Sequence, residues 1–135
     1  MVTRHTPNTW KGGPMFELNP SSDIPLNEQI VRKTKLMIAK GILKNGDDMP
    51  SVRDLSKSLL VNQSTVQKAY KKLKDEGILK TKAGLGTLVS LDHEKISMEK
   101  EICEKELYQI FLKCHFYGLE EEKIKEIYEK TKEEL

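Results

Sequence analysis

The chain has 135 residues, a formal net charge of +2, and 37% hydrophobic and 33% charged residues. This length suits one compact domain or a small domain with an appendage, and the composition is that of a chain that forms a core in water. No apolar run approaches the length that crosses a membrane, and none near the N-terminus is typical of a signal peptide. We therefore expect a cytoplasmic protein with no membrane partner.

The first fifteen residues lack any hydrophobic period and are rich in Gly, Pro, Thr and Asn. We interpret residues 1–15 as a disordered leader, in which Met15 fits a natural start better than the first residue. Neither His5 nor Trp10 within it is expected to be functional. The alternation of residues 16–19 predicts a short strand directly after the leader.

A helix is predicted to open at Pro25, because a proline in the first helical turn has no N–H to leave unbonded. This helix is expected to lie across the back of the two helices that follow. Lys33, Lys35 and Lys40 could reach phosphates, although a solvated face is the preferred interpretation. The predicted buried stripe comprises Leu26, Ile30, Met37, Ile38 and Ile42.

A second helix is predicted to start at Ser51, which stands three residues before Asp54. At this spacing the serine oxygen accepts a hydrogen bond from a first-turn N–H, and the carboxylate lies favourably in the helix dipole. The apolar stripe of this helix comprises Val52, Leu55 and Leu59, so the helix should pack on one side only.

After Leu60 and Val61 the helical period starts again. Asn62 and Ser64 are both strong helix-capping residues, which predicts the start of a third helix here. Its apolar positions are Val66, Ala69, Tyr70 and Leu73. A short turn is therefore expected to join two amphipathic helices.

The exposed face of this third helix carries short hydrogen-bonding groups backed by cations. Amide and hydroxyl groups meet base edges in a major groove and lysines meet phosphates, so we interpret the pair as a DNA-reading helix-turn-helix. Polarity alone leaves a solvated helix face as the alternative. The predicted DNA-binding residues of the pair are Arg53, Lys57, Asn62, Gln63, Ser64, Thr65, Gln67, Lys68 and Lys71.

Two short β-prone runs follow, residues 78–81 and 87–90, on either side of a glycine-containing tip. This order predicts a hairpin with about five loop residues, and a helix-turn-helix followed directly by a hairpin is a winged helix. Glycines let the backbone approach a partner closely, and Lys80 supplies charge beside the tip. The predicted DNA-binding residues of the hairpin are Lys82, Gly84 and Gly86.

Residues 25–89 resemble the GntR family of bacterial transcription regulators. The short tail and the set Asn62, Thr65 and Lys68-Ala69-Tyr70 look most like its YtrA-type branch. The resemblance implies a repressor that controls a transporter operon and its own gene, with Arg53 contacting DNA. The residues that carry it are Pro25-Leu26-Asn27-Glu28-Gln29-Ile30, Gly46, Met49-Pro50-Ser51-Val52-Arg53, Val61, Thr65-Val66, Lys68-Ala69-Tyr70, Leu73, Glu76-Gly77 and Gly84-Leu85-Gly86-Thr87.

The chain departs from the family pattern in the turn, at the start of the third helix and at the hairpin tip. Leu60 stands where the turn usually has glycine, and Gln63 stands where arginine or proline is common. Ala83 and Leu85 replace tip residues that are often basic or polar. The operator sequence is therefore not transferred with the resemblance.

The small net charge conceals an uneven distribution along the chain. Residues 44–82 carry nine Lys and Arg against five Asp and Glu, whereas residues 92–135 carry eight against thirteen. The basic excess thus lies on the DNA-reading module and the acidic excess on the tail. Because DNA would repel an acidic tail, we expect the tail to face solvent or another subunit.

Gly118 is the only glycine in residues 92–135, which contain no proline, so two helices are predicted over about residues 94–117 and 120–134. Together they carry more apolar surface than so short a hairpin can bury on itself, and an antiparallel partner is expected. In the resembling family this region dimerises the protein, and the larger effector-binding domains of that family are expected to be absent here. The predicted dimerisation residues are Cys103, Leu107, Ile110, Phe111, Cys114, Tyr117, Ile124, Ile127 and Tyr128.

Catalytic and metal-binding chemistry find little support in the sequence. Cys103 and Cys114 lie about 16 Å apart along a helix, too far for a disulfide within one chain, and are interpreted as small buried groups. Cys114 and His115 form a potential metal pair, but no second pair follows at ligand spacing. We therefore expect no metal site, no cofactor and no enzymatic activity.

The sequence thus predicts a mostly α protein with a small β-hairpin. Its parts are a disordered leader over residues 1–15, a winged helix-turn-helix domain over 16–91 and a helical dimerisation tail over 92–135. The predicted function is sequence-specific regulation of transcription by a homodimer on a near-palindromic double-stranded DNA operator. The alternative is a winged-helix module that docks protein, whose face would be poorer in lysine and richer in aromatics. No small-molecule effector is indicated.

Overall fold

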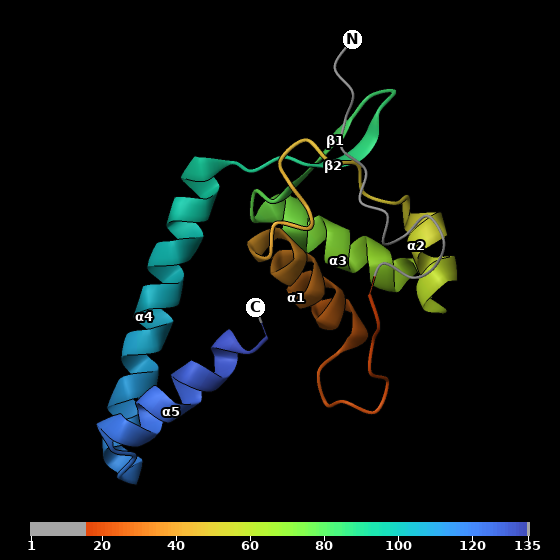
Figure 1. The fold of residues 1–135 in the computed structure, drawn as a ribbon. Helices are drawn as coiled ribbons and strands as arrows, with labels where there is room; N and C mark the ends of the chain where they lie inside the picture. The colour runs from red at the N-terminus through yellow and green to blue at the C-terminus, as the bar shows by residue number, and fades with distance from the viewer. Residues whose placement is uncertain (1–15, 135) are drawn as a thin grey trace. The chain divides into compact units, whose positions relative to one another are not determined.

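A computed structural model describes residues 16–134, so the predictions for residues 1–15 lie outside the described part of the chain. The chain divides into two compact units, Met1–His93 and Glu94–Leu135. Mostly helical structure with one small β-hairpin is present, as predicted (Figure 1). The elements are α1 (Leu26–Ala39), α2 (Val52–Leu59), α3 (Gln63–Asp75), β1 (Leu79–Lys82), β2 (Gly86–Val89), α4 (His93–Tyr117) and α5 (Glu121–Lys132).

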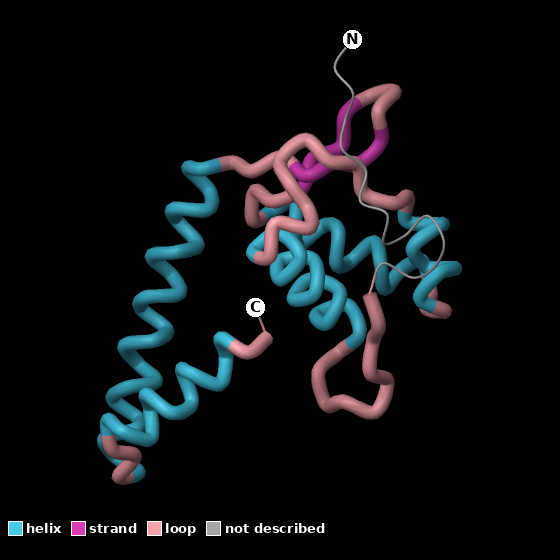
Figure 2. The backbone as a smooth tube through the Cα atoms, viewed as in Figure 1, coloured by secondary structure: helices cyan, strands magenta, loops and turns pink. Residues whose placement is uncertain are grey.

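The core of the first unit forms where α1 packs on α3, with α2 and the base of the hairpin closing its sides. Figure 2 shows the three helices gathered on one side of the hairpin. The apolar period predicted for α2 and α3 is confirmed, because Leu55, Val66, Ala69 and Leu73 are all buried. The exposed faces of α2 and α3 are thereby fixed on the opposite side from α1.

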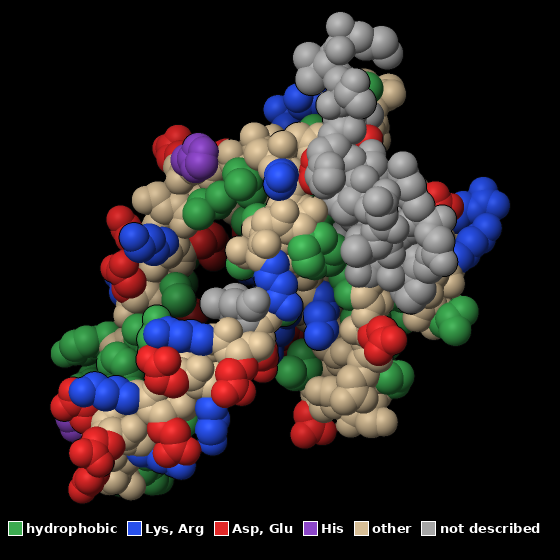
Figure 3. All heavy atoms as spheres, in the orientation of Figure 1, with side chains coloured by type: hydrophobic (Ala, Val, Ile, Leu, Met, Phe, Trp, Pro, Cys, Tyr) green, Lys and Arg blue, Asp and Glu red, His purple; other side chains and the backbone are tan. Residues whose placement is uncertain are grey.

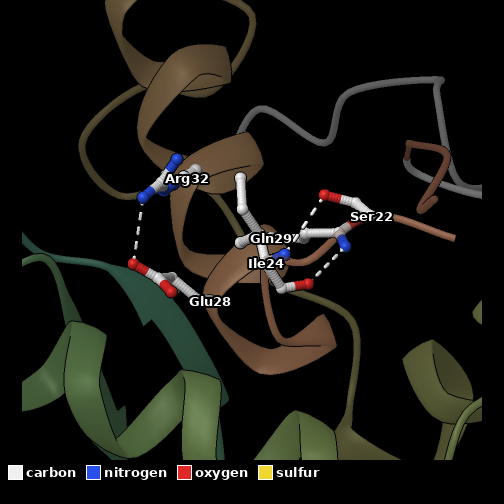
Figure 4. Close-up of polar contacts among 5 residues, drawn as sticks. All are labelled: Ser22, Ile24, Glu28, Gln29 and Arg32. Atoms are coloured by element: carbon white, nitrogen blue, oxygen red, sulfur yellow. Dashed lines mark hydrogen bonds and ion pairs between the residues drawn. The ribbon is translucent and has the colours of Figure 1, made fainter. Parts of the chain in front are cut away.

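Gln29 fastens the segment before α1 to that helix. The buried Gln29 side chain donates through Nε2 to the carbonyl oxygens of Asn19 (2.9 Å) and Ile24 (2.8 Å), and its Oε1 accepts from the Asn19 N–H at 2.8 Å; Figure 4 draws the bond to Ile24. Residues 16–19 are not a strand, so that prediction is wrong. The alternation instead places two apolar side chains on the core, while a side-chain amide takes the role of a neighbouring strand at Asn19.

The end of α1 differs from the predicted stripe. Ile30 and Met37 are buried as expected, but Ile42 is 38% exposed, so its predicted burial is wrong. The helix stops at Ala39 and the backbone reverses at Gly41, whose φ is +75°. This reversal breaks the helical period, and Leu43 instead enters the core.

The hairpin is held at its base by residues 46–49, which run beside β2. The Val89 N–H donates to the Asp47 carbonyl at 2.8 Å, and the Met49 N–H donates to the Thr87 carbonyl at 2.9 Å. The strands pair antiparallel with Thr81 opposite Thr87, and each is shifted by one residue from its predicted range. The loop is therefore three residues, 83–85, rather than about five.

The second unit consists of α4 from Glu94 onward, the turn at Gly118 and α5. The two helices agree with the predicted ranges to within two residues. They diverge from the turn in Figure 1 and do not pack on each other beyond it. Neither helix has a buried residue, so this unit has no core of its own within the described chain.

Candidate nucleic-acid interface

Tyr70 sets the position of α3 against the start of α2. Its phenol is buried in the core and its Oη donates to the Pro50 carbonyl at 2.7 Å. Burial raises the pKa of Tyr70 well above its ordinary value, so the phenol stays protonated and remains a donor. Ser51, the next residue along, caps α2 by accepting from the Asp54 N–H at 3.0 Å, as predicted.

The turn between α2 and α3 depends on a left-handed residue. Leu60 has φ 57° and ψ 45° and is 91% exposed, and it is the one non-glycine residue with positive φ in the described chain. The Val61 N–H then donates to the Ser56 carbonyl at 3.0 Å, which closes the end of α2. This conformation explains why glycine suits the position, since a side chain is disfavoured there.

The first turns of α3 present the polar face that the sequence predicted. Gln63, Ser64, Gln67 and Lys68 are exposed, and Thr65 is half-buried. Asn62 occupies the N-cap position, so the predicted start of this helix is confirmed, although the Asn62 side chain makes no cap hydrogen bond. Its amide is also exposed and faces solvent with the rest of this surface.

The cations of the two helices fall into two kinds. Arg53, Lys57 and Lys68 are exposed and form no ion pair with any residue in the described part of the chain. Lys71 instead pairs with Asp75 at 2.8 Å, and the hydrogen bond that Lys71 donates to this carboxylate raises the pKa of Lys71. Sequence reasoning missed this pair, although the spacing of four residues on a helix is its signal. Lys71 thus differs from the other three cations in having an acidic partner on its own helix.

Helix α1 offers fewer free cations for phosphate contact than the sequence suggested. Lys35, considered as a phosphate contact, lies 3.0 Å from the Glu76 carboxylate at the end of α3. This ion pair ties α1 to α3, and we assign Lys35 a structural role. Arg32 likewise pairs with Glu28 on the same helix at 3.0 Å (Figure 4).

The hairpin tip extends the exposed surface. Lys82, Gly84 and Gly86 are all exposed, and both glycines have positive φ, +77° and +73°. A Cβ at either glycine would meet nothing within 4 Å in this structure, so backbone conformation rather than space requires glycine here. The predicted residues therefore lie together at the exposed tip, Gly84 in the loop and the other two at the strand ends beside it.

The predicted dimerisation residues lie on α4 and α5 and are largely uncovered. Cys114 and Ile124 are half-buried at the turn, while Cys103 is exposed and not buried as predicted. A shallow apolar hollow opens where the helices meet, lined by Phe111, His115, Gly118, Leu119, Glu120, Glu121 and Ile124. The other predicted dimerisation residues, Leu107, Ile110, Phe111, Tyr117, Ile127 and Tyr128, are all exposed.

Two further properties bear on function. Within residues 16–134, no three His, Cys, Asp or Glu side chains gather as a metal ion would need. None of the described helices has the length and apolar character needed to cross a membrane.

Comparison with known proteins shows which family has this sequence and fold. The sequence pattern of "Bacterial regulatory proteins, gntR family" matches residues 26–89. The transcriptional repressor YtrA of Bacillus subtilis is 39% identical over 114 residues, which cover 83% of this chain and 88% of YtrA. The chain belongs to the GntR family. It is thus a DNA-binding transcription regulator and not an enzyme, as the sequence predicted.

Solved structures agree with membership of the GntR family. A transcriptional antiterminator from Listeria monocytogenes matches 89% of this chain and 91% of its own, with TM-score 0.76 and 31% identity. YtrA from Sulfolobus acidocaldarius, a GntR-family transcription factor, matches 68% of this chain and 96% of its own, with TM-score 0.56 and 35% identity. The predicted winged helix-turn-helix is confirmed.

Proposed function

We propose that this GntR-family regulator is a repressor that binds as a homodimer to a near-palindromic operator, with one α3 in each half-site. The observation that carries the proposal is the uncovered apolar surface of α4 and α5 in a single chain. On the resemblance alone, the regulated genes are proposed to include a transporter operon. The proposed compartment is the cytoplasm, where the operator lies.

The tail surface supports association with a second protein chain. Leu107 is 46% exposed and Ile110 is 55% exposed, and α5 does not cover them. Soluble monomers rarely leave a contiguous apolar patch of more than a few hundred Å² uncovered. A second copy presents the same patch, and a two-fold interface joins identical patches.

The charges of the tail and of α3 indicate different partners for these two parts of the chain. The tail carries thirteen acidic against eight basic residues, and Figure 3 shows the two kinds interspersed along α5. This surface would be repelled by phosphates. The first turn of α3, in contrast, contains no acidic residue. We therefore propose DNA as the partner of α3 and a second copy as the partner of the tail.

Each side chain of the helix pair receives a proposed role from its surroundings. Arg53, Lys57 and Lys68 are exposed cations with no ion pair to any residue of the described chain, and they are proposed to contact phosphates. Gln63 and Gln67 are proposed to read base edges, because an amide can bond both N6 and N7 of adenine. Asn62, Ser64 and Thr65 are proposed to complete the base-reading surface, while Lys71, Lys82, Gly84 and Gly86 are proposed backbone contacts.

The alternative, a winged helix that docks protein, is less well supported by α3. The aromatic residue of this helix is Tyr70, which is buried, so α3 exposes no aromatic side chain. Lys68 and Lys72 are exposed there instead. Protein-binding surfaces are typically enriched in aromatics and depleted of lysine, which is the reverse of this pattern.

The salt dependence of DNA binding tests the proposal. Full-length protein is titrated onto a labelled duplex selected from a random pool, across a series of salt concentrations. If a dimer neutralises about eight phosphates, log K should fall against log salt with a slope of about −7. Arg53→Ala should leave the fold intact, weaken binding severely and make the slope shallower by about 2, one contact from each protomer.

Lys33→Ala is the matched control, because Lys33 is an exposed lysine on α1 outside the proposed interface. This variant should keep the wild-type slope. A wild-type slope near zero would contradict the proposed binding mode. An equal change in both variants would show only that total charge matters.

A further inference from the structure

The hairpin tip carries an exposed leucine that the DNA contacts proposed above do not use. Leu85 is 52% exposed, whereas Leu79, Leu88 and Val89 of the same hairpin are buried. We propose that Leu85 presses on the floor of the minor groove beside each half-site and selects A·T over G·C pairs there. The proposal rests on the proposed function and adds a specificity-determining residue to it.

The hairpin holds Leu85 out from the rest of the unit. Its base is anchored by the Val89 N–H to Asp47 carbonyl bond at 2.8 Å and by three buried side chains, while residues 82–86 at the tip are all exposed. The Leu85 N–H donates to the Lys82 carbonyl at 3.0 Å, which closes that turn. Figure 2 shows the loop projecting beyond the helices of this unit.

The charge of the hairpin indicates an anionic partner. Residues 79–90 contain no Asp or Glu, and Lys80 and Lys82 are exposed without an ion pair in the described chain. Leu85 follows these two cations by a few residues, and a leucine finds no apolar surface on phosphates themselves. A DNA groove offers a site for the lysines and for the leucine. Its walls are anionic phosphate backbones, and its floor is formed by base edges.

The widths of the two DNA grooves favour the minor groove as the site of the hairpin tip. A major groove about 12 Å wide admits a helix, which α3 supplies, whereas the minor groove is only about 6 Å wide. Gly84 and Gly86 have no side chains, so Leu85 has no side chain on either neighbour in the sequence and is the large apolar residue of the tip. Apolar side chains of this kind are used as wedges or floor contacts by minor-groove binders.

The chemistry of the groove floor then gives a base preference. An A·T pair offers acceptors and no donor there, while a G·C pair adds the guanine 2-amino group. A leucine against that amino group removes its water without supplying an acceptor. Wild-type protein should therefore prefer A·T over G·C about tenfold at the bases under the tip.

The test replaces guanine by inosine, which lacks the 2-amino group but keeps the major-groove edge of guanine. Operator duplexes selected with full-length wild-type protein are rebuilt with A·T, G·C or I·C pairs at the positions flanking each half-site. Wild type should bind the I·C duplex within about twofold of A·T and the G·C duplex about tenfold more weakly. Leu85→Ala should bind all three alike, and Lys82→Ala should weaken all three by one common factor.

Each other outcome overturns the inference. If the I·C duplex binds as weakly as G·C, the discrimination does not come from the minor-groove amino group. If Leu85→Ala keeps the wild-type ratio, another residue reads these positions. A wild type that selects an operator but shows no flanking preference removes this inference alone, whereas a wild type that selects no duplex removes the proposed function with it.

Discussion

Leu60 holds a backbone conformation that a leucine adopts at a cost. With φ 57° it lies in the left-handed region, where a Cβ costs roughly 1–2 kcal/mol, and its side chain is 91% exposed and gains no core packing in return. Its backbone N–H donates to the Lys57 carbonyl at 3.4 Å, a bond that a glycine in its place can also make. The turn of the helix-turn-helix is therefore a site of stored strain that a single substitution can release.

Leu60→Gly should stabilise the protein by about 0.5–1 kcal/mol, because relief of strain exceeds the extra freedom of glycine in the unfolded chain. Leu60→Ala is the matched control, since it removes the same exposed surface but keeps the Cβ. Urea unfolding of both variants measures the difference. The usual order, in which alanine is more stable than glycine, would show that the turn is unstrained.

Tyr70 joins α2 to α3 through its hydrogen bond to the Pro50 carbonyl, and its burial has a pH consequence. Its pKa is about 10 in the unfolded chain and is raised by burial in the folded one. Above pH 10 the unfolded state releases the phenol proton while the folded state keeps it. The free energy of unfolding therefore falls as pH rises above 10.

Tyr70→Phe should lose about 1–2 kcal/mol at pH 7, because it leaves the Pro50 carbonyl without its 2.7 Å partner. The phenylalanine has no proton to release, so the gap between the variants should narrow between pH 9 and pH 11. Denaturant unfolding at several pH values measures that gap, and the remaining tyrosines and lysines act alike in both proteins. A gap that stays constant would mean that Tyr70 ionises equally in the two states.

At the scale of elements, local signals were sufficient for α2, α3 and the hairpin. The Ser51 cap and the apolar period of Leu55, Val66 and Leu73 act over a few residues, and the structure follows them. The exposed face of α3 was predictable for the same reason. A helix that packs on one side must present its remaining residues to solvent.

The wrong structural predictions concern segments whose conformation depends on residues distant in the sequence. Alternation at residues 16–19 predicted a strand, but no neighbouring strand exists in the described chain and the Gln29 amide takes its place. Ile42 was placed in the core because nothing in a helical period marks where α1 ends.

The sequence suggested which residues form the proposed interface, but it did not show which of their charges are paired. Lys71 was grouped with Lys68, and only the structure shows that Lys71 is paired with Asp75.

We expect Gln63→Ala to cost about 1–3 kcal/mol of binding free energy on the preferred operator and to relax the choice at one base, because Gln63 is exposed on the first turn of α3. Equilibrium titrations on the selected duplex and on single-base variants give both numbers.

Lys68→Ala is the matched control, since it should weaken all of these duplexes by one common factor. An equal loss across all sequences for Gln63→Ala would instead make Gln63 a backbone contact. The pair of variants thus separates base reading from phosphate binding within one helix.

At the scale of the whole molecule, the two units differ in what they need to be stable. Every residue of the buried core precedes α4, so the first unit holds its own core. The second unit has no buried residue, and its apolar surface has no partner within the described chain. Folding of the first unit and association through the second are therefore separable.

Ending the chain after His93 should leave a folded monomer that binds a half-site weakly. This end point keeps the Asp92 N–H, which donates to the Gly77 carbonyl at 2.8 Å below the hairpin. In the whole protein the tail gives the second half-site contact an effective concentration of roughly millimolar, so avidity of about 10² to 10⁴ is lost on deletion without loss of any protein–DNA contact. Light scattering after size exclusion gives the mass, and a titration against full and half operators gives the avidity. Should the shortened chain remain a dimer, or bind the full operator as tightly as the intact protein, the apolar tail surface would have to serve a partner other than a second copy.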